Sequence, residues 1–245
     1  MIKAVLMDVG RTIVTSRIID FGKGLKAVYD LDKRRDKCDL NEYFRVFTAL
    51  TKVSFEPARE ISSEVRITDF LAALNEITGI KLPNEYQDPK ELEYFFQCNL
   101  IEEELVDGVK DFLKYVKKSG LPVIAVSNSC MSSNALRREF KEYDIEKYFN
   151  DIISSADILI RKPRHEIFDF AYGKLVGIDN TIKKDEVVFI GDDFDCDVVG
   201  SLNGGLVAIW LNKMQEEPKN NVLPQFNVKD YNEIIEIIES INNKK

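Results

Sequence analysis

The sequence predicts an α/β protein with a doubly wound, Rossmann-like parallel sheet, and three observations support this prediction. Short apolar runs rich in Val and Ile recur along most of the chain. These runs lack strict polar–apolar alternation, so both faces of the sheet are expected to be covered by helices. Amphipathic segments lie between consecutive runs, and this strand–helix alternation is typical of right-handed crossovers within one sheet.

The individual elements follow from this alternation. Strands are predicted over residues 5–7, 122–126, 151–154, 187–190 and 206–211. Helices are predicted over residues 109–119, 134–143, 166–175 and 231–241. Gly120 and Gly177 follow two of these helices, and glycine is the residue that most often ends a helix. Most of the sheet is therefore expected from the second half of the chain.

The stretch from residue 14 to residue 104 breaks the alternation. Its apolar residues recur three and four positions apart, as in Ile67, Phe70, Leu71 and Leu74, and no strand is predicted there. We expect an all-α helical cap domain over residues 14–104, inserted into a core domain formed by residues 1–13 and 105–245. The two crossings, near residues 13–17 and 102–107, would then act as hinges of a lid.

Charge and composition exclude several classes of partner. The formal net charge of −8 disfavours non-specific binding to nucleic acid or to anionic lipid. No apolar window has the length of a transmembrane helix, and the N-terminus has no cleavage site of a signal peptide. We therefore expect a cytoplasmic protein with no nucleic-acid or membrane partner. Monomer and homodimer both remain open.

The cysteines and the single histidine limit the chemistry further. The four cysteines are widely spaced and form no CxxC pair, which predicts free thiols in a reducing compartment. His165 is the only histidine, which excludes a His-based zinc site and disfavours a Ser-His-Asp triad. It is expected at the beginning of a solvated helix, where a substrate contact is the less favoured alternative.

Polar residues follow three of the predicted strands. Asp8 ends the apolar run 2–7, and a carboxylate at the tip of a buried strand needs a cation or hydrogen bonds to offset its desolvation. Ser127 and Asp192 follow two further strands. Because ligands bind beyond the carboxyl ends of such strands, one crevice can collect all three side chains. Lys162 can reach the same crevice from its loop, and Ser127 with Asn128 can donate hydrogen bonds to a phosphoryl oxygen.

The acidic stretch from Asp192 to Asp197 is the strongest indication of a metal. Together with Asp8 it can bring several carboxylates close together, and their repulsion favours a divalent cation. Oxygen ligands favour Mg²⁺, with Ca²⁺ and Mn²⁺ as competitors. An EF-hand loop beginning at Asp193 is excluded, because Val198 and Gly204 stand where that loop needs Gly and Glu. The glycine-rich motifs of nucleotide sites are absent from the sequence.

Four stretches carry a resemblance to a known family: VLMDVGRTIV, VDGVKDFLKYVKKSGLPVIAVSN, YFNDIISSADILIRKPRHEIFDFA and VVFIGDDFDCDVVGSLNGG. Their motifs and spacing are similar to those of the haloacid dehalogenase-like (HAD) superfamily of hydrolases. The length and helical character of residues 14–104 resemble the subfamily whose cap follows the first strand. The match covers nearly the whole predicted core, whereas the cap segment matches only in these general features.

The resemblance implies a role for each of these residues. Asp8 is implied to be the nucleophile, giving an aspartyl-phosphate that water then hydrolyses. Lys162 is implied to orient Asp8 and to screen its charge, while Ser127 contacts the phosphoryl group. Thr12 would support the turn after the first strand. The implied ligands of Mg²⁺ are Asp8, the main-chain carbonyl of Gly10 and Asp192, with Asp193 or Asp197 in support.

Gly10 departs from the pattern of the family. Phosphatases of this family ordinarily have a second Asp at this position as the general acid and base, and such a group contributes about 10²–10⁴-fold in rate. Three possibilities stay open. The leaving group can be an activated one, such as an acyl or aryl phosphate, or a residue near the first hinge (Arg17, Asp20 or Lys23) can supply the proton. Alternatively, the reaction is of another type, and a phosphonatase would need a cap lysine: Lys23, Lys26, Lys33 or Lys37.

The sequence thus predicts a Mg²⁺-dependent, HAD-like hydrolase acting on a small phosphorylated metabolite. The alternatives are a phosphonatase- or dehalogenase-type hydrolase and a catalytically weak HAD-like binding protein. Dehalogenases usually carry Tyr where this chain has Gly10, which does not fit the dehalogenase alternative.

Overall fold

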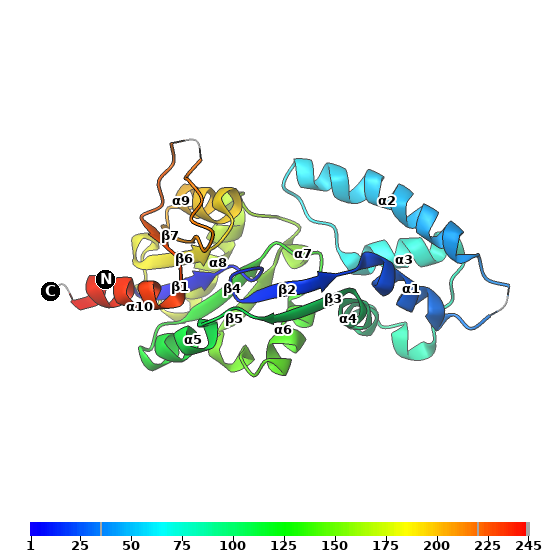
Figure 1. Ribbon diagram of the computed structural model, residues 1–245, viewed down its shortest axis with the longest axis horizontal. Helices are drawn as coiled ribbons and strands as arrows, with labels where there is room; N and C mark the ends of the chain where they lie inside the picture. Colours follow the sequence, from blue (N-terminus) through cyan, green and yellow to red (C-terminus); the bar gives the residue numbers. More distant parts are fainter. Residues whose placement is uncertain (35, 220, 244–245) are drawn as a thin grey trace.

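The computed structural model describes residues 1–34, 36–219 and 221–243. Its centre is a six-stranded sheet in the order β5-β4-β1-β6-β7-β8, and every neighbouring pair of strands is parallel (Figure 1). The strands are β1 (Ala4–Met7), β4 (Val123–Ser127), β5 (Asp151–Ser154), β6 (Val187–Gly191), β7 (Val207–Leu211) and β8 (Phe226–Val228). The predicted doubly wound α/β fold is therefore confirmed.

The position of β1 determines where the functional groups meet. It lies between β4 and β6, so that Val5 pairs with Val123 on one side and with Val188 on the other. From β1 the chain continues to β4 and β5 on one side and then returns to β6 on the other. The strand order reverses here, and such a switch point opens a crevice at the carboxyl ends of the strands.

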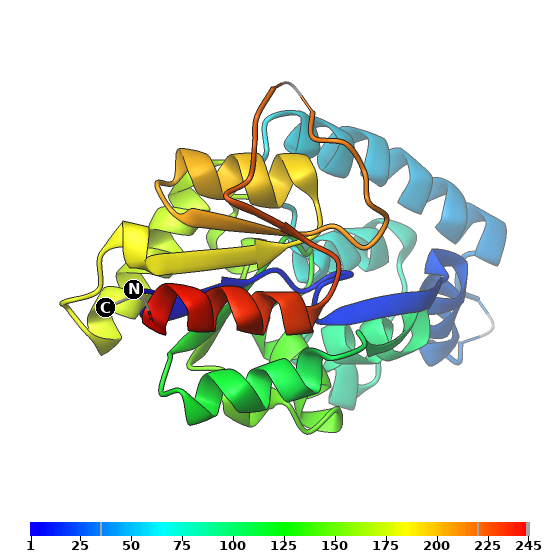
Figure 2. The same ribbon diagram turned by 60° about the vertical axis from the view of Figure 1, so that its left-hand side comes forward.

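Helices cover both faces of the sheet, as its apolar strands predict. Val5 and Met7 pack into one hydrophobic cluster, while Ala4 and Leu6 pack into another on the opposite face. The first cluster is covered by α5 (Val109–Lys118), α6 (Ser133–Glu142) and α10 (Tyr231–Asn243), and Figure 2 shows α5 and α10 side by side. The second is covered mainly by α8 (His165–Ile178).

Shorter helices complete the core. They are η2 (Glu146–Tyr148), α7 (Ser155–Ile158), η3 (Lys184–Glu186), the π-helix η4 (Phe194–Val199) and α9 (Gly200–Asn203). Among the predicted elements, α8 begins at His165 as expected but continues through Gly177 to Ile178. Gly120, by contrast, has a φ of 70° and follows the end of α5. The edge strand β8 was not predicted.

Two strands lie within the segment that was expected to be purely helical. β2 (Val14–Ile19) and β3 (Ile101–Leu105) form an antiparallel ribbon in which Val14 pairs with Leu105 and Ile19 with Ile101. The prediction that residues 14–104 contain no strand is therefore wrong. The sequences VTSRII and IEEEL carry too many polar residues for a buried strand, and the ribbon is stabilised instead by cross-strand pairs such as Arg17 with Glu104.

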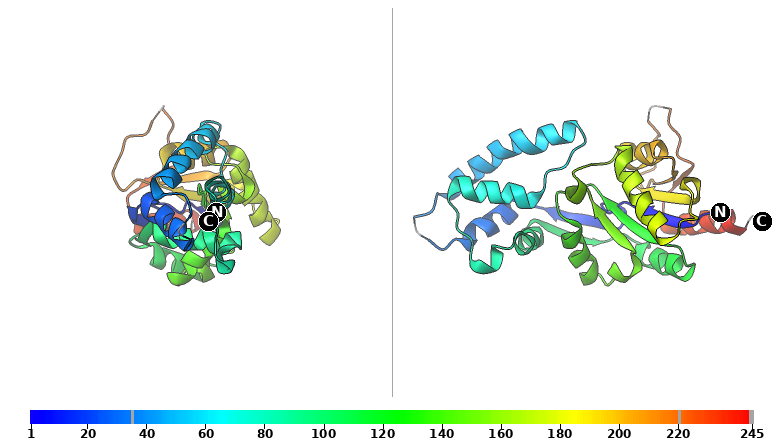
Figure 3. Two further views of the ribbon diagram at one scale, coloured as in Figure 1. Left: turned by 90° about the vertical axis from the view of Figure 1, so that its right-hand side faces the viewer. Right: turned by 180° about the vertical axis from the view of Figure 1, so that it is seen from behind.

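The helices between β2 and β3 pack together at one end of the core (Figures 1 and 3). They are α1 (Phe21–Leu31), α2 (Leu40–Glu60), α3 (Ile67–Thr78), η1 (Asn84–Tyr86) and α4 (Pro89–Leu100). Their buried side chains, among them Leu25, Tyr43 and Phe96, form one hydrophobic cluster that also includes Met131 and Ala135 from the α6 region. None of the described helices is both long and apolar enough to span a membrane.

Candidate active site

The carboxyl ends of β1, β4 and β6 meet at one cleft, as the sequence predicts. Asp8, Ser127 and Asp192 line this cleft together with Lys162, and its volume is about 720 Å³. The main-chain N–H of Asp8 donates to the carbonyl of Ile190 at 2.8 Å, so the β1–β6 ladder extends to Asp8 itself. The nucleophile predicted from the sequence is thus held by the sheet rather than by a mobile loop.

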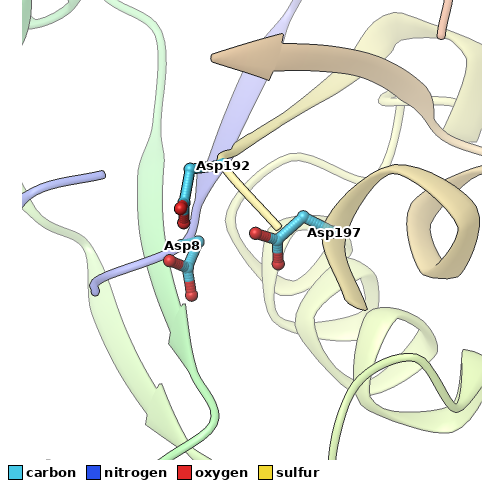
Figure 4. Close-up of side chains that lie close together, drawn as sticks. All are labelled: Asp8, Asp192 and Asp197. Carbon is cyan, nitrogen blue, oxygen red and sulfur yellow. The ribbon is translucent and has the colours of Figure 1, made fainter. Parts of the chain in front are cut away.

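Three carboxylates converge in the cleft. Asp8, Asp192 and Asp197 each offer an oxygen atom, and these atoms lie within 4.8 Å of one another. Figure 4 shows the three side chains close together, with Asp8 after β1, Asp192 after β6 and Asp197 on η4. Asp8 and Asp197 are both buried, and burial together with the charge of Asp8 raises the pKa of Asp192 to about 6. The site is therefore short of positive charge.

Lys162 supplies part of that charge. Its ammonium donates to Asp8, to Asp197 at 2.7 Å and to the carbonyl of Val126 at 3.1 Å, and its side chain is only 1% exposed. Burial by itself lowers the pKa of Lys162, but the charges of Asp197 and Asp8 outweigh this and hold it above its usual range. Lys162 is therefore a permanent cation between the two carboxylates.

Asn128 positions the backbone of Lys162. Its side-chain oxygen accepts from the Lys162 N–H at 2.8 Å, and its side-chain nitrogen donates to the Lys162 carbonyl at 2.9 Å. The same nitrogen lies 3.8 Å from the sulfur of Cys196. The side-chain amide of Asn128 is thus already hydrogen-bonded within the protein. The phosphate contact expected of this residue stays a prediction, and its main-chain N–H is the group that could make it.

Asp193 and Asp197 have different surroundings. Asp193 caps η4, because its carboxylate accepts from the N–H of Cys196 at 2.8 Å. Asp197 is 1% exposed, accepts from the N–H of Asp193 at 3.0 Å, and belongs to the carboxylate cluster. Burial raises the pKa of Asp197, an effect that Lys162 partly offsets. A Cβ atom at Gly191 would lie 2.3 Å from an oxygen of Asp197, so this cluster requires glycine there.

Ser127 and Thr12 lie on either side of Asp8. Ser127 is buried at the end of β4, and its hydroxyl makes no hydrogen bond to any part of the chain that the structure describes. The Thr12 side chain is fully buried in the turn after β1, and its carbonyl accepts from the hydroxyl of Tyr231 at 2.6 Å. Ser127 is thus free to meet a ligand, whereas Thr12 anchors the turn.

The donor set is suited to a hard divalent cation. The three carboxylates provide oxygen ligands close together, and oxygen is the ligand atom that Mg²⁺ prefers. Their negative charge also favours a divalent cation. Asp8, Asp192 and Asp197 are the side chains that could hold such an ion.

Comparison with known proteins decides the family. A model of the haloacid dehalogenase-like hydrolases matches residues 2–205. The chain belongs to this HAD-like hydrolase family. A full-length relative is human N-acylneuraminate-9-phosphatase, which is 22% identical over 99% of this chain and 96% of its own length. Pyrimidine 5'-nucleotidase YjjG of Escherichia coli is 27% identical, but the match spans only 38% of this chain and 40% of that enzyme.

Solved structures show the same fold. The 2-haloacid dehalogenase of Pseudomonas syringae pv. Tomato superposes with a TM-score of 0.68 at 17% identity, covering 98% of this chain and all of that one (100%). A HAD phosphatase from Thermococcus onnurineus superposes with a TM-score of 0.61 at 19% identity, covering 97% and 98% of the two chains. At these identities the comparison supports the fold of the HAD-like core and the inserted segment alone.

Gly10 and Arg11 line the cleft directly after Asp8 and Val9. No atom lies within 4 Å of a Cβ built on Gly10, which is exposed at the rim of the cleft. Arg11 has a φ of 55°, and its guanidinium pairs with Asp192 at 2.7 Å. Arg11 was not predicted as a site residue, because a single Arg in a turn carries no pattern that indicates a site. The only feature of the sequence that pointed to Arg11 was its position directly after Gly10.

Proposed function

We propose that this HAD-like hydrolase is a Mg²⁺-dependent phosphatase that acts on a small phosphorylated metabolite. The observation that carries the proposal is the buried contact of Asp8 with the ammonium of Lys162, at the centre of a carboxylate cluster. A full-length relative at 22% identity is a sugar-acid phosphatase by its name, which supports the same class of reaction.

The residues of the cleft have the chemistry that this reaction needs. Lys162 holds Oδ1 of Asp8, so we assign the attack on phosphorus to Oδ2. As the new O–P bond forms, the P–O bond to the leaving group breaks. Water then attacks the aspartyl-phosphate, which releases inorganic phosphate and restores the Asp8 carboxylate. When bound by Asp8, Asp192 and the carbonyl of Gly10, Mg²⁺ would neutralise charge on the phosphoryl oxygens.

Lys162 and Ser127 would act on the phosphoryl group and its nucleophile. The ammonium of Lys162 fixes the orientation of Asp8 and reduces its repulsion from an anionic substrate. The free hydroxyl of Ser127 would donate to a phosphoryl oxygen, as would the main-chain N–H of Asn128. Asp197 would support the ammonium of Lys162 as well as the metal.

The proton for the leaving group is the remaining question. Arg17, Asp20 and Lys23 do not line the cleft; Arg17 pairs with Glu104 and Lys23 with Glu102 on the β2–β3 ribbon. Two carboxylates of residues 14–104, Glu64 and Glu103, do line the cleft, but Glu64 is paired with Arg161 and Glu103 accepts from the hydroxyl of Ser16. We therefore infer that the preferred substrates have an activated leaving group, such as an acyl or aryl phosphate. No lysine from the described part of residues 14–104 lines the cleft, which disfavours the phosphonatase alternative.

We further propose that residues 14–104 form a cap whose hinges are the two strands of the ribbon. Thr15, Ser16, Phe21 and Gln97 from this segment line the same cleft as Asp8. A substrate in the cleft would therefore contact both parts of the chain, and the organic part of the substrate would be selected by the cap side.

The test is hydrolysis of p-nitrophenyl phosphate with Mg²⁺ and with excess EDTA. The wild type is expected to turn over only with Mg²⁺, and Asp8→Asn is expected to lose all measurable turnover. Asp195→Asn is the matched control, because Asp195 lies in the same acidic stretch but points to Lys219 at the surface. Turnover by a folded Asp8→Asn variant equal to that of the wild type would rule out the assigned nucleophile.

A further inference from the structure

A short strap of the inserted segment lies against the loop that carries Lys162. This strap, residues 62–66, connects α2 with α3 and forms an antiparallel bridge between Ser63 and Ile160. The N–H of Arg161 donates to the carbonyl of Ser62 at 3.0 Å, and the N–H of Glu64 donates to the carbonyl of Leu159 at 3.3 Å. The strap thus fixes the residue immediately before Lys162.

The carboxylate of Glu64 is the centre of this contact. Glu64 is only 6% exposed, pairs with the guanidinium of Arg161, and accepts from the hydroxyl of Ser155 at 2.6 Å. The Ser155 oxygen in turn accepts from the N–H of Ser129 at 2.9 Å. A buried carboxylate with two charge-assisted partners holds both of them in defined positions.

These contacts converge on the two loops of the catalytic cleft. Arg161 precedes Lys162 in the chain, and Ser129 follows Asn128, whose amide holds the Lys162 backbone from both sides. One carboxylate of the inserted segment therefore connects to the loop after β4 and to the loop that carries Lys162. Neither Glu64 nor Ser155 was a candidate from the sequence.

We propose that Glu64 is a positioning residue: by holding Arg161 and Ser155, it aligns Lys162 and the Ser127–Ser129 loop when the inserted segment docks on the core. The proposal rests on the phosphatase function proposed above. It predicts that the inserted segment contributes to the rate of the chemical step as well as to substrate choice, because a displacement of about 1 Å in such a group can cost about 100-fold in rate.

The position of Arg161 gives a kinetic signature. Arg161 lines the cleft, and Glu64 neutralises it. In Glu64→Gln the guanidinium would be released toward the cleft, where added positive charge favours binding of an anionic substrate. We therefore expect kcat for p-nitrophenyl phosphate to fall about 10- to 100-fold while KM stays unchanged or decreases. A general loss of docking would instead raise KM.

Glu91→Gln is the matched control. Glu91 on α4 pairs with Arg138 on α6, so it also joins the inserted segment to the core, but at the surface and outside the lining of the cleft that contains Lys162. Its kcat is expected to stay within about twofold of the wild type, as for exposed ion pairs in general. In a double-mutant cycle, Glu64→Gln combined with Arg161→Gln should lose no more than the worse single variant, because both changes break the same Glu64–Arg161 pair.

Hydrogen–deuterium exchange provides a readout that does not depend on turnover. Glu64→Gln should increase exchange at residues 128–129 and 159–162 while the strands of the sheet stay protected, and Glu91→Gln should not. Ser155→Ala removes only one hydroxyl and serves as a second variant in case Glu64→Gln does not fold. It should also increase exchange at residues 128–129. An unchanged kcat in Glu64→Gln, an equal loss in Glu91→Gln, or unchanged exchange in both loops would overturn the proposal. Absent turnover in the wild type would contradict the phosphatase function instead.

Discussion

Lys162 donates a hydrogen bond from its ammonium to the carboxylate of Asp8, although 154 positions separate the two residues in the sequence. The same ammonium contacts Asp197, so one cation serves two buried carboxylates. Without the ammonium of Lys162, Asp8 and Asp197 would both lose the cation that pairs with them.

Replacing Lys162 by Met should both destabilise the protein and abolish turnover. The change leaves Asp8 and Asp197 buried without their cation, and breaking a buried pair in this way costs about 3–5 kcal/mol. Urea unfolding with and without MgCl₂ measures the effect, and Mg²⁺ is expected to restore part of the loss. Equal stability of Lys162→Met and wild type in EDTA would contradict this account.

Gly10→Asp should raise the hydrolysis of alkyl phosphates. The position is open and its φ is not in the left-handed region, so a carboxyl group can be accommodated at the rim of the cleft. A positioned general acid contributes about 10²–10⁴-fold, and we expect the lower end of that range. Turnover of an alkyl phosphate measures it. Gly173→Asp, which adds the same charge at another open position, is the control and should change nothing.

Arg11→Gln should tighten the binding of Mg²⁺. Arg11 pairs with Asp192 at 2.7 Å and therefore competes with a cation for this carboxylate, but its side chain is 67% exposed. Exposed pairs contribute at most about 1 kcal/mol, so the gain in affinity is expected to be about twofold to fivefold. Isothermal titration calorimetry gives the value directly. Lys219→Gln, next to Asp195, should leave the affinity unaltered.

Glu139 should make the protein less stable as the pH rises. Burial raises the pKa of this carboxyl from 4.5 to about 9, with a further contribution from Glu103. The folded state therefore keeps a proton that the unfolded chain releases, so stability falls between about pH 4.5 and pH 9. Glu139→Gln removes this dependence, so the variant should be more stable than the wild type at pH 8 but not at pH 4.5. Thermal unfolding at the two pH values tests the difference, and parallel curves would contradict it.

The core of the fold could be predicted because its apolar runs are also the segments that the sheet buries. Apolar runs such as 187–190 can be buried on both faces, and the polar residue that follows each run has to lie at the crevice. Asp8, Ser127 and Asp192 line the same cleft for this reason, and Lys162 reaches it from the loop before α8. The single unusual residue, Gly10, was also visible from the sequence, since it stands at a position where the resemblance leads one to expect Asp.

The remaining features depend on contacts between distant segments. Residues 101–105 read IEEEL, and nothing local indicates a strand until Ser16 and Arg17 come to lie opposite the glutamates. Phe226–Val228 is too short to be recognised without the neighbouring strand β7. Glu64 lies in a polar connection between helices, and its burial depends on Arg161 and Ser155, 97 and 91 positions later.

The register of the β2–β3 ribbon has a practical consequence. Ile19 and Ile101 are direct partners at its outer end, so the two points where a chain of 81 residues (20–100) leaves and returns are adjacent in space. A tight turn could therefore join them and give a minimal protein without the helices, in which the apolar side chains of Met131 and Ala135 would be newly exposed. Equally, a segment of different shape could be transplanted between the same two residues without altering the path of the sheet.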